Sequence, residues 1–591
     1  MNAPVPLESL PSWDLSDLYP GMESLELARD LERAAVDAKA FAADYETRMA
    51  SLDGAEMARS LARFETLQET LGRITSYASL VYSGDQSDPK IGQFYQNVQE
   101  KVTEITSLLL FFSLEINRIE DAEMEKKLED KALAHYRPWL RDCRAYRPHQ
   151  LSDEVEKLLH EKYVAGRAAW TRLFDETMAR LRFPLDGKDL TSAEILHLLS
   201  EKDGERRKRA AQSFGKVMGD NVGVFALITN TLAKDKEIED RWRHFERPPS
   251  ARNLSNQVED EVVEALVGAV KAGYPKLAHR YYALKAKWFG ADKLDYWDRN
   301  APLPESDDRV IPWPEATKTV LEAYNAFSPD LASVGRKFFD NAWIDAPVRP
   351  GKSPGAFAHP TVPSAHPYLL LNYQGRVRDV MTLAHELGHG VHQVLSADQG
   401  YLMADTPLTL AETASVFGEM LTFRALLEQQ KDATKRKVML ASKVEDMLNT
   451  VVRQIAFYDF ELRVHTERRQ GELTADRLGE IWMAVQTESL GPVFRFHDEY
   501  RHYWAYIPHF VHSPFYVYAY AFGDCLVNSL YAVYQDGAPG FQQRYLDMLR
   551  AGGTLRHKEL LAPFGLDASD PAFWQKGIGI ISGFIDELEK M

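Results

Sequence analysis

One short motif in this chain combines residues that could do chemistry: residues 385–389 have the sequence His-Glu-Leu-Gly-His. On a helix, residues four apart lie about 40° apart around the axis, so His385 and His389 project from one face. Two neutral imidazoles one turn apart can bind a single Zn2+ ion. Glu386 lies on the adjoining side, where it is badly placed as a ligand. It is well placed to take a proton from a metal-activated water and to deliver it to a leaving amine.

Although it has only five residues, the motif rarely occurs by chance. A chance match to His-Glu-x-x-His is expected roughly 0.03–0.04 times in a chain of this composition. Its surroundings form a continuous helical pattern over residues 379–394, and Gly388 would permit close backbone approach beside a metal. The pattern therefore predicts a zinc site, the alternative being two hydrogen-bonded histidines on an ordinary helix. We interpret the nearby His392 as structural rather than as a ligand.

A catalytic zinc ion needs a third protein ligand and keeps its fourth position for water. The best candidate is Glu412, in a second helical segment that follows turn signals near Gly400 and Pro407. Glu412 and Glu419 are seven residues apart, so both can face the motif helix. We predict Glu412 as the ligand and Glu419 as an outer partner that orients an imidazole. The alternative is an ordinary exposed acidic pair.

Helices must position these residues. Helix-forming residues dominate the first 240 residues and again the chain after residue 379, with glycine and proline sparse inside the long segments. Residues 368–373, Tyr-Leu-Leu-Leu-Asn-Tyr, form a short apolar run between Pro367 and Gly375, which is typical of a strand. The sequence thus predicts a mainly α protein with a small β element just before the motif.

Composition and charge exclude several classes of protein. The 591 residues include 70 Lys and Arg against 87 Asp and Glu, a formal charge of −17, which argues against nucleic acid and anionic membrane as partners. Two distant cysteines, Cys143 and Cys525, fit a reducing compartment. The first ten residues lack the features of a secretory signal. Residues 504–523 carry no formal charge, but their prolines and histidines indicate buried interior rather than a membrane span. We expect a cytoplasmic protein.

Several longer stretches carry a family resemblance. They are Gly355-Ala-Phe, His366-Pro-Tyr-Leu-Leu-Leu-Asn-Tyr-Gln-Gly, Arg378-Asp-Val-Met-Thr-Leu-Ala-His-Glu-Leu-Gly-His, Ile507-Pro-His-Phe and Pro514-Phe-Tyr-Val-Tyr-Ala-Tyr-Ala-Phe-Gly. Together with Glu412, they resemble the thimet-type zinc oligopeptidases and specifically their oligoendopeptidase F branch. The resemblance covers about residues 200 to 585, and the N-terminal helices fit more loosely.

The resemblance implies a mainly α, two-lobed helical zincin-type metallopeptidase. It implies a deep central channel with zinc at its floor and a small β-sheet next to the zinc helix. We expect an N-terminal helical domain over residues 1–200 and a catalytic domain over residues 201–591. It also implies that one edge strand binds the substrate backbone, as an unpaired strand edge can. The residues of that strand would be Tyr368, Leu369, Leu370, Leu371, Asn372 and Tyr373.

A second chemical site is expected near residue 515. Peptide hydrolysis passes through a tetrahedral oxyanion that needs hydrogen-bond donors besides the metal. The resemblance implies a histidine, His509 or His512, and tyrosines from this segment, for which we take Tyr516 and Tyr520. Ser513 and the proline after it predict a helix start that would put both tyrosines on one face. A strand would instead align three alternating tyrosines, and an aromatic core stripe is the other alternative.

These observations predict a zinc-dependent oligoendopeptidase with one Zn2+ per chain, which cleaves internal bonds of short, unstructured peptides. One alternative is a zinc carboxypeptidase or dipeptidase of similar helical architecture, which trims chain ends. A more distant one is a non-catalytic, zinc-containing peptide-binding protein, against which a complete general base at Glu386 argues. The sequence leaves the oligomeric state and the side-chain specificity open.

Overall fold

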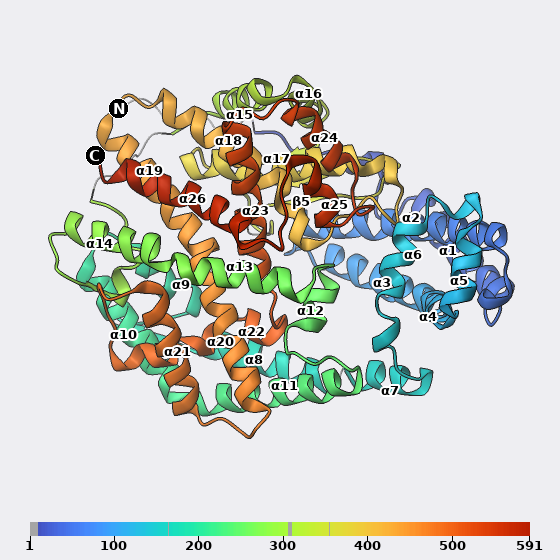
Figure 1. The fold of residues 1–591 in the computed structure, drawn as a ribbon, viewed down its shortest axis with the longest axis horizontal. Helices are drawn as coiled ribbons and strands as arrows, with labels where there is room; N and C mark the ends of the chain where they lie inside the picture. Colours follow the sequence, from blue (N-terminus) through green and yellow to red (C-terminus); the bar gives the residue numbers. More distant parts are fainter. Residues whose placement is uncertain (1–9, 164, 305–309, 354) are drawn as a thin grey trace. The chain divides into compact units, whose positions relative to one another are not determined.

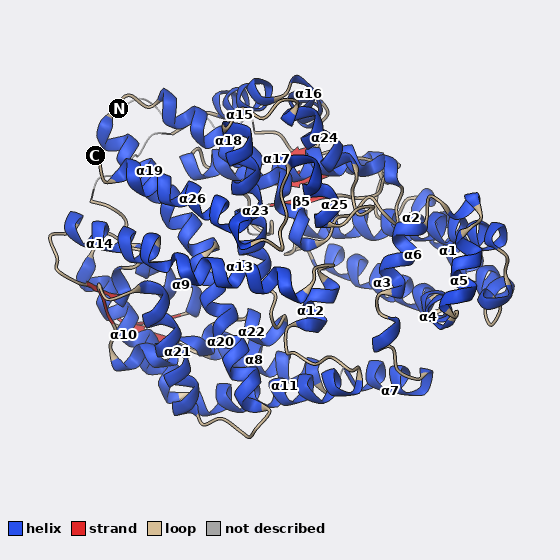
Figure 2. Ribbon diagram, viewed as in Figure 1, coloured by secondary structure: helices blue, strands red, loops and turns tan. Residues whose placement is uncertain are grey.

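The computed structural model describes residues 10–163, 165–304, 310–353 and 355–591, and most of them lie in helices (Figures 1 and 2). Their contacts form two compact units. Unit 1 consists of the described residues within 1–147, 308–429 and 537–564, and unit 2 of those within 148–307, 430–536 and 565–591. The predicted mainly α fold is confirmed. The domain boundary expected at residue 200 lies inside unit 2, and the division into two domains there stays a prediction. The central channel also stays a prediction.

Unit 1 begins with a helical bundle around one apolar cluster. Its second helix starts with a capping box, in which Asp53 and Glu56 each accept the other's backbone N–H. The rings of Phe41, Phe64 and Phe112 meet in the core, with centroids 4.6 to 6.0 Å apart. The helices of unit 1 are α1 (Leu25–Tyr45), α2 (Gly54–Gly84), α3 (Pro89–Ser107), α4 (Leu110–Arg118), α5 (Asp121–Leu128), α6 (Arg137–Arg144), α15 (Trp313–Phe327), α16 (Pro329–Asp340), α17 (Val377–Ser396), α18 (Leu408–Gln429), α24 (Phe541–Arg550) and α25 (His557–Leu561).

A three-stranded sheet precedes α17 in the chain. It has the order β4–β6–β5, where β4 is Ile344–Asp345, β5 is Phe357–His359 and β6 is Tyr368–Leu370. β6 pairs parallel with β4 and antiparallel with β5, and all three of its residues are buried. A small β element next to the motif helix is therefore confirmed.

The prediction that residues 368–373 form an edge strand is wrong. β6 is the central strand, and beyond it the N–H groups of Leu371 and Tyr373 donate to the carbonyls of Asp345 and Ala346. The substrate-backbone role expected of Tyr368, Leu369, Leu370, Leu371, Asn372 and Tyr373 thus loses its basis. An apolar run without alternation is typical of a strand buried on both faces, and this was the signal in the sequence.

Unit 2 is also helical and contains two small two-stranded sheets. In one, β1 (Phe183–Leu185) pairs with β2 (Lys188–Leu190), and in the other, β3 (Leu294–Asp295) pairs with β7 (Phe494–Arg495). The buried helix α23 packs against α26 and α20. The helices of unit 2 are α7 (Asp153–Tyr163), α8 (Arg167–Arg180), α9 (Ser192–His197), α10 (Gly204–Asp220), α11 (Val222–Trp242), α12 (Ser250–Ser255), α13 (Asp260–Gly273), α14 (Ala278–Trp288), α19 (Ala433–Thr450), α20 (Val452–Arg468), α21 (Ala475–Leu490), α22 (His509–His512), α23 (Tyr518–Gln535) and α26 (Pro571–Leu588).

Among the described residues, no helix has an apolar, nearly uncharged stretch long enough to span a bilayer. The uncharged segment 504–523 belongs to unit 2, where most of its residues are buried, as predicted. Residues 1–9 lie outside the described residues. They include most of the ten-residue segment in which the sequence shows no features of a secretory signal.

Candidate active site

The predicted motif lies in the middle of α17. This helix starts at a turn where the Asp379 carboxylate accepts the backbone N–H groups of Gln374 and Arg376, both at 2.9 Å. Because His385 and His389 are one turn apart, their rings lie side by side, with centroids 4.9 Å apart. Both side chains are about three-quarters or more shielded from solvent.

α18 brings Glu412 to these imidazoles. The Oε2 atom of Glu412 lies 3.3 Å from Nε2 of His385 and 3.5 Å from Nε2 of His389. One ligand atom from each of the three residues lies within 4.8 Å of the others, so the group could hold a metal ion. The convergence on which the predicted site depends is therefore present within unit 1.

The spacing of this group matches a zinc ion. Zinc binds nitrogen and oxygen at about 2.0–2.2 Å, which places neighbouring tetrahedral ligands about 3.3–3.5 Å apart. The two distances from Glu412 Oε2 have this length and exceed the usual hydrogen-bond range. Two nitrogens and one carboxylate oxygen also form a donor set that zinc favours. The residues present thus fit the metal.

Glu419 lies on the other side of His385. Its Oε2 atom is 3.3 Å from Nδ1 of that ring, so the two carboxylates face opposite nitrogens of one imidazole. Burial lowers the pKa of His385, but the hydrogen bond to Glu419 and the charges of Glu412 and Glu386 outweigh it and raise the pKa to about 9. The same negative surroundings favour a cation between the side chains.

Glu386 is buried beside this group but is not part of it. Burial raises the pKa of Glu386 to about 7. The charge of His385 and a hydrogen bond from the backbone of Ala358 lower this pKa but do not outweigh the burial. Ala358 belongs to β5, and its carbonyl also accepts a long hydrogen bond of 3.5 Å from Gln393 of α17. β5 therefore runs along the motif helix, next to the proposed base.

Two further residues shape the site, and their roles could not be predicted from the sequence. Ser415 donates a hydrogen bond of 2.6 Å to Oε2 of Glu412, the same atom that faces both imidazoles. Tyr324 of α15 donates to the carbonyl of Ala384 at 2.7 Å, next to the first motif histidine. The only sequence signal for Ser415 was its position one helical turn after Glu412, which allows contact on the same face.

Gly388 sets the spacing of α17 and α18. An ideal Cβ there would lie 2.5 Å from the carbonyl oxygen of Ala414 and 2.6 Å from Cα of Ser415. Real Cβ atoms do not approach backbone so closely, so glycine lets the helices touch at the level of the ligands. The predicted close backbone approach at Gly388 is confirmed, and the backbone that it meets is that of α18.

His392 has a different environment from the two motif histidines. It is buried, and burial together with the neighbouring His389 lowers its pKa to about 4, although a hydrogen bond with the backbone of Leu549 acts in the opposite direction. It does not belong to the metal-competent group of the described residues. This agrees with its interpretation as a structural residue.

The second predicted set lies in unit 2. His509 Nε2 is 3.3 Å from the hydroxyl of Tyr520, and the rings of Tyr516 and Tyr520 are 5.3 Å apart. His512 instead pairs with Asp175 of α8, at 2.8 Å. The hydroxyl of Tyr518 meets the side chain of Asn256. The geometry thus groups His509 with the two tyrosines and leaves His512 aside.

The helix start predicted at residues 513 and 514 is wrong. α23 begins at Tyr518, because the preceding turn contains Phe515 with a φ of 59°. This left-handed conformation is costly for an aromatic residue, and a hydrogen bond of 2.9 Å from its N–H to Glu461 of α20 stabilises it. Tyr516 and Tyr520 still share one side, although only Tyr520 is helical.

A helical protein with His-Glu-x-x-His on one helix and a converging glutamate on the next has the site of a metallopeptidase. Comparison with known proteins supports this class. Residues 197–580 match the family described as Peptidase family M3, and residues 115–183 match the one described as Oligopeptidase F. The chain belongs to peptidase family M3. It is a metallopeptidase whose substrates are peptides, which confirms the family resemblance.

Individual relatives match along nearly the whole chain. Oligopeptidase PepF of Bacillus subtilis (strain 168) is 27% identical over 604 residues, covering 98% of this chain and 87% of that protein. Group B oligopeptidase PepB of Streptococcus agalactiae is 26% identical over 598 residues, covering 99% and 98%. In fold, the chain is similar to a putative peptidase from Chlamydophila abortus, with a TM-score of 0.87 at 22% identity and 98% of each chain covered.

Proposed function

We propose that this metallopeptidase is a zinc-dependent oligoendopeptidase, which hydrolyses internal bonds of short, unstructured peptides. The observation that carries the proposal is the position of Glu412 Oε2, 3.3 and 3.5 Å from the Nε2 atoms of the two motif histidines. A tetrahedral zinc ion requires this spacing. His385, His389 and Glu412 would hold one ion per chain, and Glu419 would orient His385.

When bound, zinc supplies Lewis acidity, which acidifies a water molecule and polarises the carbonyl of the substrate. The chain itself supplies the proton transfers. Glu386 would take a proton from the attacking water and then deliver it to the leaving amine. Its buried position beside the ligands supports this role, because a carboxylate with a raised pKa can both accept and return a proton near neutral pH.

The substrate backbone needs a strand edge close to Glu386. β5 has a strand neighbour on one side only among the described strands, and its Ala358 contacts the motif helix through Glu386 and Gln393. We therefore assign the outer edge of β5, rather than β6, to an extended peptide.

Hydrogen-bond donors for the oxyanion stay a prediction from the family resemblance. His509, Tyr516 and Tyr520 form one group, and their mutual contacts support a common role. His512 is the weaker candidate, because Asp175 engages its ring.

Cleavage of internal bonds is supported by the names of the relatives, several of which are described as oligoendopeptidase F homologues. The experiment that tests the proposal uses internally quenched peptides blocked at both ends, with metal analysis of the purified protein. We expect cleavage inside the blocked peptides, one zinc per chain, loss of cleavage on chelation and recovery with added zinc. Uncut blocked peptides alongside shortened free-ended peptides would establish the carboxypeptidase or dipeptidase alternative instead.

A further inference from the structure

A cavity of about 570 Å³ adjoins the candidate metal site within unit 1. His389 contributes to its wall, and His392 and Gln393 continue the wall along α17. The volume lies in the range of ligand-binding pockets. His389, a proposed metal ligand, forms part of this wall. A substrate side chain bound in the cavity would therefore come from a residue close to the scissile bond.

Two connecting segments supply much of the rest of the wall, to which Lys337 of α16, Trp343 and Ala411 of α18 also contribute. Pro360, Val362 and Pro363 follow β5. Residues 401, 402 and 404–406 belong to the connection between α17 and α18. Hydrogen bonds to other parts of unit 1 anchor that connection. The N–H of Leu402 donates to Glu65 at 3.2 Å, and the N–H of Gly553 donates to the carbonyl of Met403 at 2.8 Å. The apolar prolines and valine suit the hydrocarbon part of a long side chain.

Asp405 is the acidic side chain among the described residues that line this cavity. Its carboxylate accepts the N–H of Thr406 at 3.0 Å. The side chain is open to solvent, yet protein atoms crowd it and raise its pKa, as expected on a concave wall. Within the described part of the chain, no cation is among the groups that shift this pKa. A carboxylate in such surroundings gains from a cation that enters the pocket.

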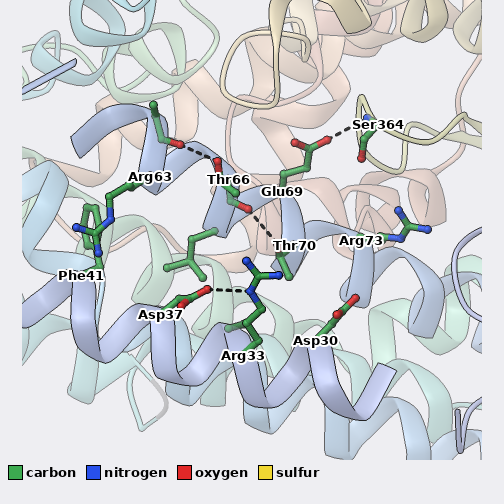
Figure 3. A pocket seen from close by; sticks show the side chains of 13 residues that line it. Asp30, Arg33, Asp37, Phe41, Arg63, Thr66, Glu69, Thr70, Arg73 and Ser364 are labelled. Atoms are coloured by element: carbon green, nitrogen blue, oxygen red, sulfur yellow. Dashed lines mark hydrogen bonds and ion pairs between the residues drawn. The ribbon is translucent and has the colours of Figure 1, made fainter. Parts of the chain in front are cut away.

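A pocket between α1 and α2 shows the contrasting case (Figure 3). There, Arg33 lies 3.5 Å from Asp37, and the carboxylate of Glu69 accepts the N–H of Ser364 at 2.9 Å. Arg63 pairs with Asp44 at 2.8 Å. These charged groups already have partners in the protein, so this pocket offers no comparable recognition element.

We propose that the cavity beside His389 is a substrate side-chain site that favours lysine or arginine, with Asp405 as the group that recognises the cation. The inference rests on the proposed peptidase function and deepens it. The residue recognised lies at one fixed position relative to the cleaved bond, because the cavity and the metal ligands share a wall. The free amino terminus of a short peptide is also a cation that Asp405 could bind. The experiment must therefore distinguish it from a lysine or arginine side chain.

The test uses blocked, internally quenched peptides that carry arginine, lysine or norleucine at each position around the cleaved bond. Norleucine keeps the apolar stem of lysine without its charge. For the wild-type protein, we expect kcat/KM to be about tenfold higher for the basic residues at one position. Asp405→Asn should reduce this ratio to near one, whereas Asp405→Glu should retain a preference. Asp398→Asn, in the same connection, is the matched control and should leave the ratio unchanged.

A second arm compares peptides with acetylated and free amino termini. A preference that appears only with the free terminus would overturn the side-chain assignment. A wild-type ratio near one at every position would overturn the proposal even if the Asp405 variants failed to fold, as would an undiminished ratio in Asp405→Asn. A wild-type protein that cleaves none of the peptides would instead refute the proposed function, and the inference with it.

Discussion

Glu419 lies 3.3 Å from Nδ1 of His385, on the opposite side of the ring from Glu412. A carboxylate in this position accepts the Nδ1 proton, leaves the Nε2 lone pair free for a metal and increases the basicity of the ring. The seven-residue spacing of the two glutamates on α18 thus places one carboxylate at each nitrogen of the same imidazole.

Glu419→Gln keeps the size of the side chain and removes its charge. We expect the zinc affinity to fall about 10-fold, at the lower end of the effect of such outer ligands. Competition with a chromophoric chelator measures the change. Glu428→Gln, at an exposed position of α18, is the control and should bind zinc like the wild type. Equal affinities for both variants would contradict the orienting role of Glu419.

Glu386→Gln should abolish proton transfer while the three ligands remain. We expect kcat to fall about 10²- to 10⁴-fold, the usual contribution of a general acid–base group. The zinc content should stay at the wild-type level, because Glu386 is outside the metal-competent group. Single-turnover rates and elemental analysis of the same preparation provide both readouts. Unchanged turnover with zinc still bound would show that another group is the base.

Gly388→Ala should force α17 and α18 apart, since the added Cβ meets backbone atoms at 2.5 and 2.6 Å. We expect a loss of about 1–3 kcal/mol in the free energy of unfolding, together with weaker zinc binding. Gly583→Ala is a matched control within another helix, α26, because a Cβ there meets nothing within 4 Å. It should stabilise the protein by about 0.5–1 kcal/mol. Denaturant unfolding with and without zinc compares the two.

Tyr520→Phe removes a hydroxyl that lies 3.3 Å from His509. If this hydroxyl donates to the oxyanion, kcat should fall about 100-fold with little change in KM, because the hydrogen bond forms mainly in the transition state. Tyr534→Phe, on the same helix, should leave both constants unchanged. A fall in thermal stability without an effect on kcat would show that Tyr520 is a core residue.

Glu461 should make stability depend on pH. Burial raises its pKa to about 8 from an ordinary 4.5, and the charges of Arg252 and Lys236 offset this only in part. Between these pH values the folded state keeps a proton that the unfolded state has released. The contribution of Glu461 to stability is therefore fully present below about pH 4.5 and is lost as the pH rises towards 8, by at most about 1.4 kcal/mol per pH unit.

Glu461→Gln should make this dependence shallower, because glutamine does not titrate, while Glu386 with its raised pKa keeps part of the slope. Its carbonyl oxygen can still accept the N–H of Phe515, so the left-handed turn keeps its hydrogen bond. Glu467→Gln, on the same helix, is the control: a hydrogen bond from Arg477 lowers the pKa of Glu467, so its removal should not alter the slope above pH 5. Unfolding midpoints measured from pH 5 to 8 compare the slopes, and an unchanged slope in Glu461→Gln would contradict the prediction.

Much of the metal site was predictable because its geometry is local. Residues four or seven apart on a helix share a face whatever the rest of the chain does, so the shared face of His385 and His389 and that of Glu412 and Glu419 follow from spacing. A strand was also predictable over residues 368–373, between Pro367 and Gly375, although β6 occupies only the first half of that run, Tyr368–Leu370. Its place in the sheet was not, because the order of strands depends on β4 and β5, which lie elsewhere in the chain.

The amino-acid sequence alone determined the helical class, the family and the faces on which the ligands lie, since these depend on composition and on helical periodicity. Only the tertiary structure decided that Glu412 and Glu419 meet opposite nitrogens of His385, that β6 is central, that Phe515 delays the start of α23 and that Asp405 faces the cavity beside His389. Such relationships join residues far apart in the chain. They are set by packing, for example where Gly388 lets α17 touch the backbone of α18, and no periodicity within a single segment encodes them.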